Sequence, residues 1–530
     1  MVNLNIFNTV KGAQTPKANT TNHAGGLAYE LTPKHQLAQL ASTGCMNQTF
    51  YAGAEDQLAK VLELTQNLDA EFIAKTAIYA REEGYMKDMP ALLAAILSTK
   101  DSALLDQNFH RMINNGKMLR NFVQIMRSGV VGRQSLGSRP KKLVQAWLLT
   151  ATEKQLLNAS IGQSPYLADV VKMVHPKANE SWRNEWFSWL IGRPFDEAKL
   201  PPITQAFEQY KKAVLNGSAK SLTVPDVPFQ MLTALDLDRD AWAAIAKNGS
   251  WQMVRQNLNT FARHGVFDLP EMMENIAAKL ADQSLIERAN VMPYQLLSAY
   301  TMTANQSNIP YAVKEALQDA LEIAVSNVPK IAGKVVVGTD VSGSMTSPVT
   351  GYRQGATTSV TCLQVASLIS AAILRHNPEA RIMPFDTGVH STTLNPRDSI
   401  LTNAQKLAKF CGGGTDVSAP FKRLNKERAN VDVMIIVSDN ESWFNSQRYG
   451  ATETMKAWSV LKANNPKAKL ICIDIQPYVT SQAKEGADIL NVGGFSDAGF
   501  DMMASFANNG NDADHWVDVI ENVQLTSNND

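Results

Sequence analysis

Five side chains with carboxylate or hydroxyl oxygens lie in turns where together they could bind a divalent cation. These candidate ligands are Asp340, Ser342, Ser344, Thr415 and Asp439. The first three occupy alternate positions of one turn, in which Gly343 lets the backbone curl without a Cβ clash. The fourth follows the glycine run 412–414. Hard oxygen ligands with few carboxylates favour Mg²⁺, with Mn²⁺ as an alternative. The absence of Cys and His from these turns disfavours zinc.

The candidate ligands follow short apolar segments or lie between them, and the pattern of these segments predicts parallel β-strands. The predicted strands are 334–338, 381–385, 431–437 and 469–475. Predicted helices alternate with them over 360–375, 403–410, 419–427 and 454–463. Such alternation indicates a doubly wound, Rossmann-like α/β domain with a mostly parallel sheet. Because ligands of such sheets bind beyond the carboxyl ends of the strands, the five side chains are expected to meet there.

This combination resembles the metal-ion-dependent adhesion site of von Willebrand factor A domains, over residues 331–500. In that family the equivalents of the first four candidates ligate the metal, and the equivalent of Asp439 acts directly or through water. One departure is Ser438-Asp439-Asn440, where many relatives have Thr-Asp-Gly. A lone Asp-x-Ser-x-Ser turn would fit a helix-capping loop as well. A third hypothesis is a metal-dependent phosphohydrolase with Asp340 as the nucleophile. Ser342 opposes it, because this serine stands where a second aspartate would act as acid and base.

Residues 30–330 follow a different pattern, with apolar residues at helical spacing and almost no alternating segment. Turn pairs such as Asn115-Gly116 and Asn248-Gly249 separate the segments. Many short helices with brief connections predict a stacked helix-pair solenoid. The expected domains are an N-terminal extension at 1–20, a helical-repeat domain at 21–330, the α/β domain at 331–500, and a C-terminal helix and tail at 501–530.

A stretch without acidic residues runs from Gln107 to Leu149. Since the chain has 50 acidic residues in 530 positions, about four would be expected among the 46 positions between Asp106 and Glu153. The cations of this stretch are His110, Arg111, Lys117, Arg120, Arg127, Arg133, Arg139, Lys141 and Lys142. Ser138 is expected to cap a helix whose free N–H groups, beside these cations, would bind phosphate. The stretch therefore indicates a polyanion-binding surface, with a solvated basic helix face as the alternative.

The overall composition narrows the function classes. A net charge of zero excludes a protein coated in basic residues, and 45% hydrophobic with 19% charged residues is typical of a folded soluble chain. No apolar run reaches the roughly 18 residues of a membrane span, and the N-terminus lacks the pattern of a secretion signal. The expected location is the cytoplasm.

The order of the two halves and several local strings resemble the Ro autoantigen family, the TROVE-domain RNA-binding proteins. The strings include Asn22–Gly26, Thr49–Tyr51, Ala80–Gly84, Pro228–Leu232 and Pro293-Tyr294, and the resemblance covers residues 20–500. It implies a ring of HEAT-like helical repeats closed by the A domain. It also implies a basic outer face for a small noncoding Y RNA, and a central hole for the 3′ ends of misfolded or structured RNA.

The resemblance and the acid-free stretch together give the candidate RNA-contacting residues. These are Arg120, Arg127, Arg133, Arg139, Lys141, Lys142, Lys172, His175, Arg263 and His264. The last two are assigned to the hole, although each such residue taken alone is more often a surface or capping residue. The resemblance further implies a non-catalytic ribonucleoprotein component in RNA quality control or degradation, monomeric as a protein, with an exoribonuclease as a further partner. The alternative is an adhesion- or chelatase-like scaffold that binds a protein through its metal.

Overall fold

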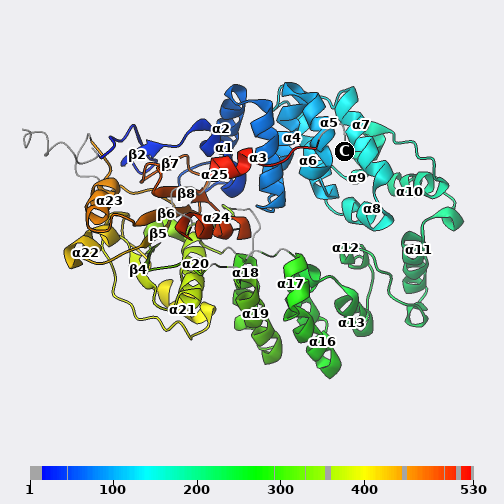
Figure 1. Cartoon of the computed structure of the whole chain (residues 1–530). Coiled ribbons are helices and arrows are strands. Elements are labelled where there is room, and N and C mark those ends of the chain that lie inside the picture. Colours follow the sequence, from blue (N-terminus) through cyan, green and yellow to red (C-terminus); the bar gives the residue numbers. More distant parts are fainter. Residues whose placement is uncertain are drawn as a thin grey trace, which may run out of the picture. The chain divides into compact units, whose positions relative to one another are not determined.

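The chain divides into two compact units (Figure 1). The computed structural model describes residues 15–44, 46–289, 291, 293–326, 328, 330–352, 360–443, 450–494, 496–508 and 515–526. One unit contains residues 1–64 and 327–519, and the other contains residues 65–326 and 520–530. The expected domain boundary at 330 lies close to this division. In contrast to the expected domains, however, the first 64 residues belong to the same unit as the α/β domain.

The first unit is built on a five-stranded parallel sheet. Its strands are β3 (Val335–Asp340), β4 (Arg381–Phe385), β5 (Val433–Ser438), β6 (Lys469–Asp474) and β8 (Ile489–Gly493). Their order is β4-β3-β5-β6-β8, and every neighbouring pair is parallel. The α/β class and four of the strands were predicted, and both predictions are confirmed. The fifth strand, β8, was missed, because polar Asn491 interrupts its short apolar segment.

Helices cover both faces of this sheet. The helices of the unit are α1 (Pro33–Thr43), α2 (Ala54–Asn67), α20 (Cys362–His376), α21 (Ile400–Leu407), α22 (Ala419–Glu427), α23 (Glu453–Asn464), α24 (Asp497–Asn508) and α25 (Trp516–Glu521). The Thr339 hydroxyl shares a 2.7 Å hydrogen bond with Ser370 of α20, whereas a Cβ on neighbouring Gly338 would meet Pro420 of α22. Because successive strand residues point to opposite faces, α20 and α22 lie on opposite sides of the sheet. The domain is therefore doubly wound, as predicted.

A second, small antiparallel sheet joins the N-terminus to this unit. It consists of β1 (Thr20–Thr21), β2 (Leu27–Glu30) and β7 (Thr480–Ser481), in the order β1-β2-β7. Tyr29 of β2 pairs with Ser481 of β7. Residues 21–30, which the sequence led us to expect in the helical domain, thus contribute strands that pair within the first unit. Strands this short carry little local signal, and their pairing joins segments from opposite ends of the chain.

The second unit consists of short helices (Figure 1). Its α-helices are α3 (Ala70–Glu82), α4 (Asp88–Lys100), α5 (Ser102–Met112), α6 (Gly116–Ser128), α7 (Ser138–Thr150), α8 (Glu153–Ser160), α9 (Leu167–Val174), α10 (Ser181–Ile191), α11 (Pro202–Leu215), α12 (Phe229–Leu232), α13 (Arg239–Asn248), α14 (Trp251–Gln256), α15 (Leu258–Arg263), α16 (Pro270–Leu280), α17 (Gln283–Ala289), α18 (Pro293–Ala304) and α19 (Tyr311–Ala324). Helices two apart in sequence pack together: α3 with α5, α5 with α7, α7 with α9, and α4 with α6. This stacking confirms the predicted helix-pair arrangement; the ring implied by the resemblance stays a prediction. Among the described residues, no helix combines the length and apolar character that a membrane crossing requires.

Candidate metal centre and nucleic-acid interface

The end of β3 and the turn that follows it hold Asp340, Ser342 and Ser344 in a hydrogen-bonded network. The Ser342 amide donates to Oδ1 of Asp340 at 2.9 Å, and the Ser438 hydroxyl donates to Oδ2 at 2.6 Å. The hydroxyl oxygens of Ser342 and Ser344 lie 3.3 Å apart. All four side chains are buried. One carboxylate and two hydroxyl groups are thus fixed at the carboxyl end of the central strand.

Parallel pairing of β3 with β5 brings Asp439 to the same edge of the sheet. Asp439 directly follows β5, and its carboxylate accepts hydrogen bonds from the Ser344 side chain and, at 3.1 Å, from the Glu441 amide. Asn440 stands where many relatives of the resembled family have glycine, and its φ is 56°. Glycine favours this left-handed region, but asparagine tolerates it better than most other residues. The departure seen in the sequence therefore keeps the tight turn.

The glycine loop that carries Thr415 is tied to both of the other loops. The Gly343 amide donates to the Gly413 carbonyl at 3.1 Å, and the Gly412 amide donates to the Val341 carbonyl at the same distance. The Ser442 hydroxyl donates to the Thr415 carbonyl, also at 3.1 Å. The structure thus places all five candidate ligands in three loops that hydrogen-bond to one another.

The electrostatics of this edge favour a bound cation. Burial raises the pKa of Asp340 above its usual value, and burial together with the nearby Asp340 raises the pKa of Asp439. Burial also raises the pKa of Asp474, at the end of β6. A divalent cation would favour the charged carboxylates that burial penalises. Among the described residues, no three His, Cys, Asp or Glu side chains form a metal-binding group. The candidate donor set is accordingly two carboxylates and three hydroxyls, which suits a hard cation.

The N-terminal segment contacts the loop that follows Asp439, which the sequence analysis did not anticipate. The Asn22 side-chain amide donates to the Ser442 carbonyl at 2.7 Å, and the Ala24 amide donates to Oε2 of Glu441 at 3.1 Å. His23 Nδ1 lies 3.3 Å from Oε1 of Glu441, and this carboxylate raises the pKa of the imidazole. The string Asn22–Gly26 contributed to the family resemblance, but nothing local in it indicated this contact.

Two tyrosines complete the surroundings of the candidate metal centre. The Tyr51 amide donates to the Tyr478 hydroxyl at 3.1 Å, and the ring centres of Tyr478 and His23 lie 5.1 Å apart. The Tyr51 hydroxyl hydrogen-bonds with Ser344, a candidate ligand. Burial and the nearby Asp439 raise the pKa of Tyr51 to about 12, so the phenol stays neutral near physiological pH. Tyr51 is therefore a neutral neighbour of the site.

Within the acid-free stretch, Arg120 does not fit the predicted RNA contact. Its side chain is buried on α6, and the guanidinium donates to the Ile161 carbonyl at 2.5 Å and the Pro165 carbonyl at 3.3 Å. Burial lowers the pKa of this group. The guanidinium ties α6 to the connection between α8 and α9, and it does not face a ligand. Composition counted Arg120 as part of a basic surface, but its position on the helix points it inward.

Replacement of Arg120 by alanine is expected to destabilise the protein without a specific effect on RNA. The loss of its hydrogen bonds leaves two carbonyl groups unpaired, which costs about 2–4 kcal/mol of unfolding free energy. Urea unfolding measures this change. Arg127→Ala, on the exposed face of the same helix, is the control and should change the stability by less than about 0.5 kcal/mol. Equal effects of the two substitutions would contradict the structural role.

Arg133 and Arg139 are partly committed to contacts within the protein. One guanidinium nitrogen of Arg133 donates to the Ser98 carbonyl at 3.0 Å. Arg139 pairs with Asp106 at 3.4 Å, and it also hydrogen-bonds with the Ser102 hydroxyl. The acid just before the acid-free stretch thus neutralises one of its cations. The predicted Ser138 cap is also wrong, because α7 begins at Ser138 and its cap is Gly137, whose φ of 71° favours glycine.

Four further candidates, Arg127, Lys142, Lys172 and His175, have exposed side chains. Lys141 and Lys142 are the fourth and fifth residues of α7, and Lys172 lies in the last turn of α9. Of these three lysines, Lys141 is half-buried. Helices α7 and α9 pack together, and Gln145 of α7 donates to the Val174 carbonyl at 2.5 Å. Within the described part of the chain, the side chains of these three lysines form no ion pair or hydrogen bond. We call them the lysine cluster; Arg127 and His175 are exposed at the ends of α6 and α9.

Arg263 and His264 lie at the end of α15, far in sequence from the lysine cluster. Arg263 is exposed, and His264 is half-buried. The His264 ring stacks on Trp242, with ring centres 4.2 Å apart and planes 16° apart. This contact gives His264 a packing role in the helical unit. The structure leaves their predicted place at a central hole untested.

Comparisons with known proteins agree with these features. Residues 334–507 match the family model described as the Ro60 vWA domain. The chain is 23% identical to the RNA-binding protein RO60 of Deinococcus radiodurans over 539 residues, with 95% of this chain and 98% of that protein covered. It is 26% identical over 255 residues to the RNA-binding protein RO60 of Caenorhabditis elegans, a match that covers 46% of this chain and 38% of that protein. The crystal structure of the D. radiodurans RO (RSR) protein shares the fold, with a TM-score of 0.61 at 20% identity over 90% of this chain and 99% of that one.

Proposed function

We propose that this chain is a non-catalytic RNA-binding protein of the Ro type, because residues 334–507 match the Ro60 vWA domain and 95% of the chain aligns with an RNA-binding protein RO60. The observation that carries the proposal is the lysine cluster, Lys141, Lys142 and Lys172. It presents three positive charges on two adjacent helices, and no carboxylate of the described residues neutralises them. Phosphate groups are the natural partners of such unpaired cations, and RNA presents them at regular spacing.

In this proposal the bound RNA is a small structured RNA of the Y type on the basic face. The 3′ ends of misfolded or structured RNA occupy a separate site that includes Arg263. Arg127, His175 and the uncommitted nitrogens of Arg133 extend the basic face around the lysine cluster. This role belongs to RNA quality control in the cytoplasm, with an exoribonuclease as partner. Shape and phosphate contacts, which need no catalytic group, suffice for such binding.

We further propose that Asp340, Ser342, Ser344, Thr415 and Asp439 hold Mg²⁺ or Mn²⁺. The support is the donor set itself: buried hard oxygens on three loops, with two carboxylates whose ionisation burial opposes. A cation there would cross-link the three loops at the sheet edge. Position 342 holds a serine where a phosphohydrolase would have its acid/base aspartate, which argues against phosphoryl transfer. The proposed role of the ion is therefore structural.

Binding of the purified full chain to RNA at increasing salt concentration tests the function. We expect affinity for a single-stranded RNA to fall linearly on a logarithmic salt scale, with a slope of about −0.7 for each phosphate contact. Sequencing of the RNA that co-purifies with the chain identifies its natural partners. An affinity that does not change between low and high salt would contradict binding through phosphate contacts.

A further inference from the structure

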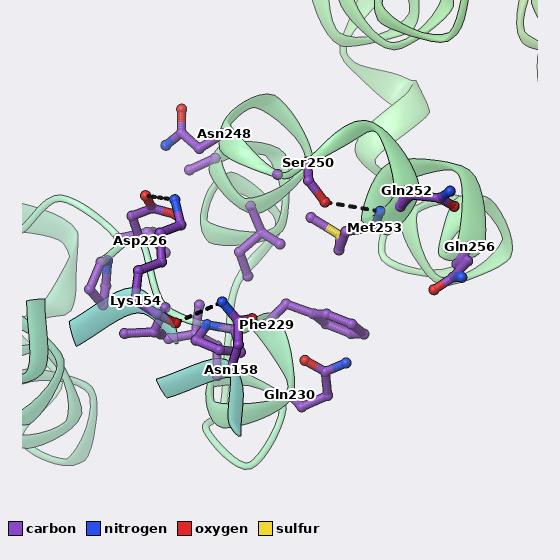
Figure 2. A pocket seen from close by; sticks show the side chains of 18 residues that line it. Lys154, Asn158, Asp226, Phe229, Gln230, Asn248, Ser250, Gln252, Met253 and Gln256 are labelled. Atoms are coloured by element: carbon purple, nitrogen blue, oxygen red, sulfur yellow. Dashed lines mark hydrogen bonds and ion pairs between the residues drawn. The ribbon is translucent and has the colours of Figure 1, made fainter. Parts of the chain in front are cut away.

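A cavity in the helical unit lies outside both sites described above (Figure 2). Its volume is about 410 Å³, within the roughly 300–1,000 Å³ typical of small-molecule sites. Its walls come from α8, from the segment 224–230 that leads into α12, and from α13 and α14. Segment 224–230 includes Phe229 and Gln230, part of a string that supported the family resemblance but was given no role. The cavity therefore lies among residues that the proposed function leaves unexplained.

Side-chain amides dominate the polar lining. They belong to Asn158, Gln230, Asn248, Gln252 and Gln256, and Figure 2 shows them together around the cavity. In the described part of the chain, the side chains of Gln230, Asn248 and Gln256 form no hydrogen bond, and all three are exposed. An amide carries both a donor and an acceptor. Three amides without hydrogen-bond partners among the described residues therefore suit a ligand whose edge carries both hydrogen-bond donors and acceptors.

Two of the cavity's walls are held in place by the surrounding structure. Oε1 of Gln252 accepts hydrogen bonds from two nitrogens of Arg255, at 2.9 and 3.3 Å, and its Nε2 donates to the Ala289 carbonyl. Lys279 donates to three carbonyls at the end of α13, including that of Gly249 at 2.9 Å. A Cβ on Gly249 would lie 1.8 Å from the terminal carbon of Met253. The glycine thus leaves room for the thioether in the cavity wall.

The apolar and charged groups of the lining narrow the ligand class further. Phe229, half-buried, and Met253 supply an aromatic ring and a polarisable thioether, which suit the face of a flat, unsaturated ring. The charged groups, Lys154 and Asp226, neutralise each other in an ion pair of 2.8 Å. A lining with no unpaired charge favours a neutral ligand over a phosphate group.

We propose that this cavity takes one unstacked nucleobase of a bound RNA strand. The base face stacks on Phe229, and its edge hydrogen-bonds with the amides of Gln230, Asn248 and Gln256. Proteins commonly read single-stranded RNA by such stacking and edge contacts. This inference rests on the proposed RNA binding and adds base recognition to it. The lysine cluster binds phosphate groups, whereas this cavity binds a base.

Fluorescence anisotropy with two labelled single-stranded RNAs tests the inference. One RNA has a mixed sequence, and the other has the same length with abasic sites that keep every phosphate. Phe229→Ala should weaken binding of the intact RNA roughly 5- to 100-fold and leave the abasic RNA and the salt slope unchanged. The double variant Gln230→Ala/Gln256→Ala, at exposed positions that spare the packing, should have the same selectivity. Gln306→Ala, exposed elsewhere in this unit, is the matched control.

The outcomes separate this inference from the proposed function. If the full chain binds both RNAs and the pocket variants leave the intact-to-abasic ratio unchanged, the base pocket is wrong and RNA binding stands. If the full chain binds neither RNA, the proposed function fails. In that case, calorimetric titration with free adenosine and uridine shows whether the cavity takes a free nucleoside. Such binding would overturn the assignment to an RNA strand.

Discussion

The triple variant Lys141→Ala/Lys142→Ala/Lys172→Ala is expected to bind single-stranded RNA about 100-fold more weakly than the parent at 0.1 M salt. Each phosphate contact to a single strand contributes about 0.7 to the salt slope, so three lost contacts remove about two powers of ten between 1 M and 0.1 M salt. The magnitude of the slope should fall by about 2 as well. Anisotropy titrations at five or more salt concentrations measure both quantities. Alanine is well tolerated in the turns of α7 and α9, so the fold should persist.

A matched control removes three lysines from the same unit that already have carboxylate partners. Lys199 pairs with Asp196 at 3.0 Å, Lys211 pairs with Glu208 at 3.1 Å, and Lys212 pairs with Glu197. Replacement of these three by alanine changes the net charge by the same amount. If the two triple variants lost equal affinity, binding would depend on overall charge, and the lysine cluster would have no special role.

Asp340→Asn is expected to abolish stabilisation of the chain by Mg²⁺. A ligand at 100 times its dissociation constant raises the free energy of unfolding by about 2.7 kcal/mol when it binds only the folded state. The parent should show such a rise, measured by urea unfolding of the first unit with and without Mg²⁺, and the variant should show none. Without the ion, the variant should be about as stable as the parent, because it removes a buried carboxylate that is costly to ionise.

The pH dependence of the Mg²⁺ effect gives a second measure of the same site. The pKa of Asp439 is raised above its usual 3.8, so a proton competes with the cation above the pH where an ordinary aspartate is already ionised. Stabilisation by Mg²⁺ should therefore keep growing as the pH rises from 4 to beyond neutrality. Asp398→Asn is the control, since Asp398 pairs with Lys406 at 2.7 Å in a different loop. A Mg²⁺ effect that persists in Asp340→Asn would place the ion elsewhere.

Local patterns were sufficient to predict the α/β domain and its candidate ligands. Buried parallel strands appear in the sequence as continuous apolar runs. An Asp or Ser that closes such a run indicates where the strand ends. Asp340 and Asp439 are far apart in sequence, yet their convergence follows from one rule, that parallel strands end at the same edge. The pairing of β3 with β5 satisfies that rule. The left-handed φ of Asn440, by contrast, could be seen only in three dimensions.

The basic stretch shows where composition stops being informative. A count of charges cannot distinguish Arg120, which is buried against two carbonyls, from Lys142, which faces solvent. Nor can it show that Asp106, just outside the stretch, pairs with Arg139. Burial and pairing depend on which helix face meets which neighbour. That information is distributed over several helices and does not reside in any one segment.

The amino-acid sequence alone determined the class of each half, four of the five parallel strands, and the oxygen-rich turns, because these follow from periodicity and chemistry within a dozen residues. Only the tertiary structure decided which cations remain available, where the N-terminal strands pair, and that amides from α8, α12, α13 and α14 surround one cavity. The physical reason is that strand pairing, burial and cavity formation are contacts between segments distant in sequence, whose energies depend on the packing of the whole unit.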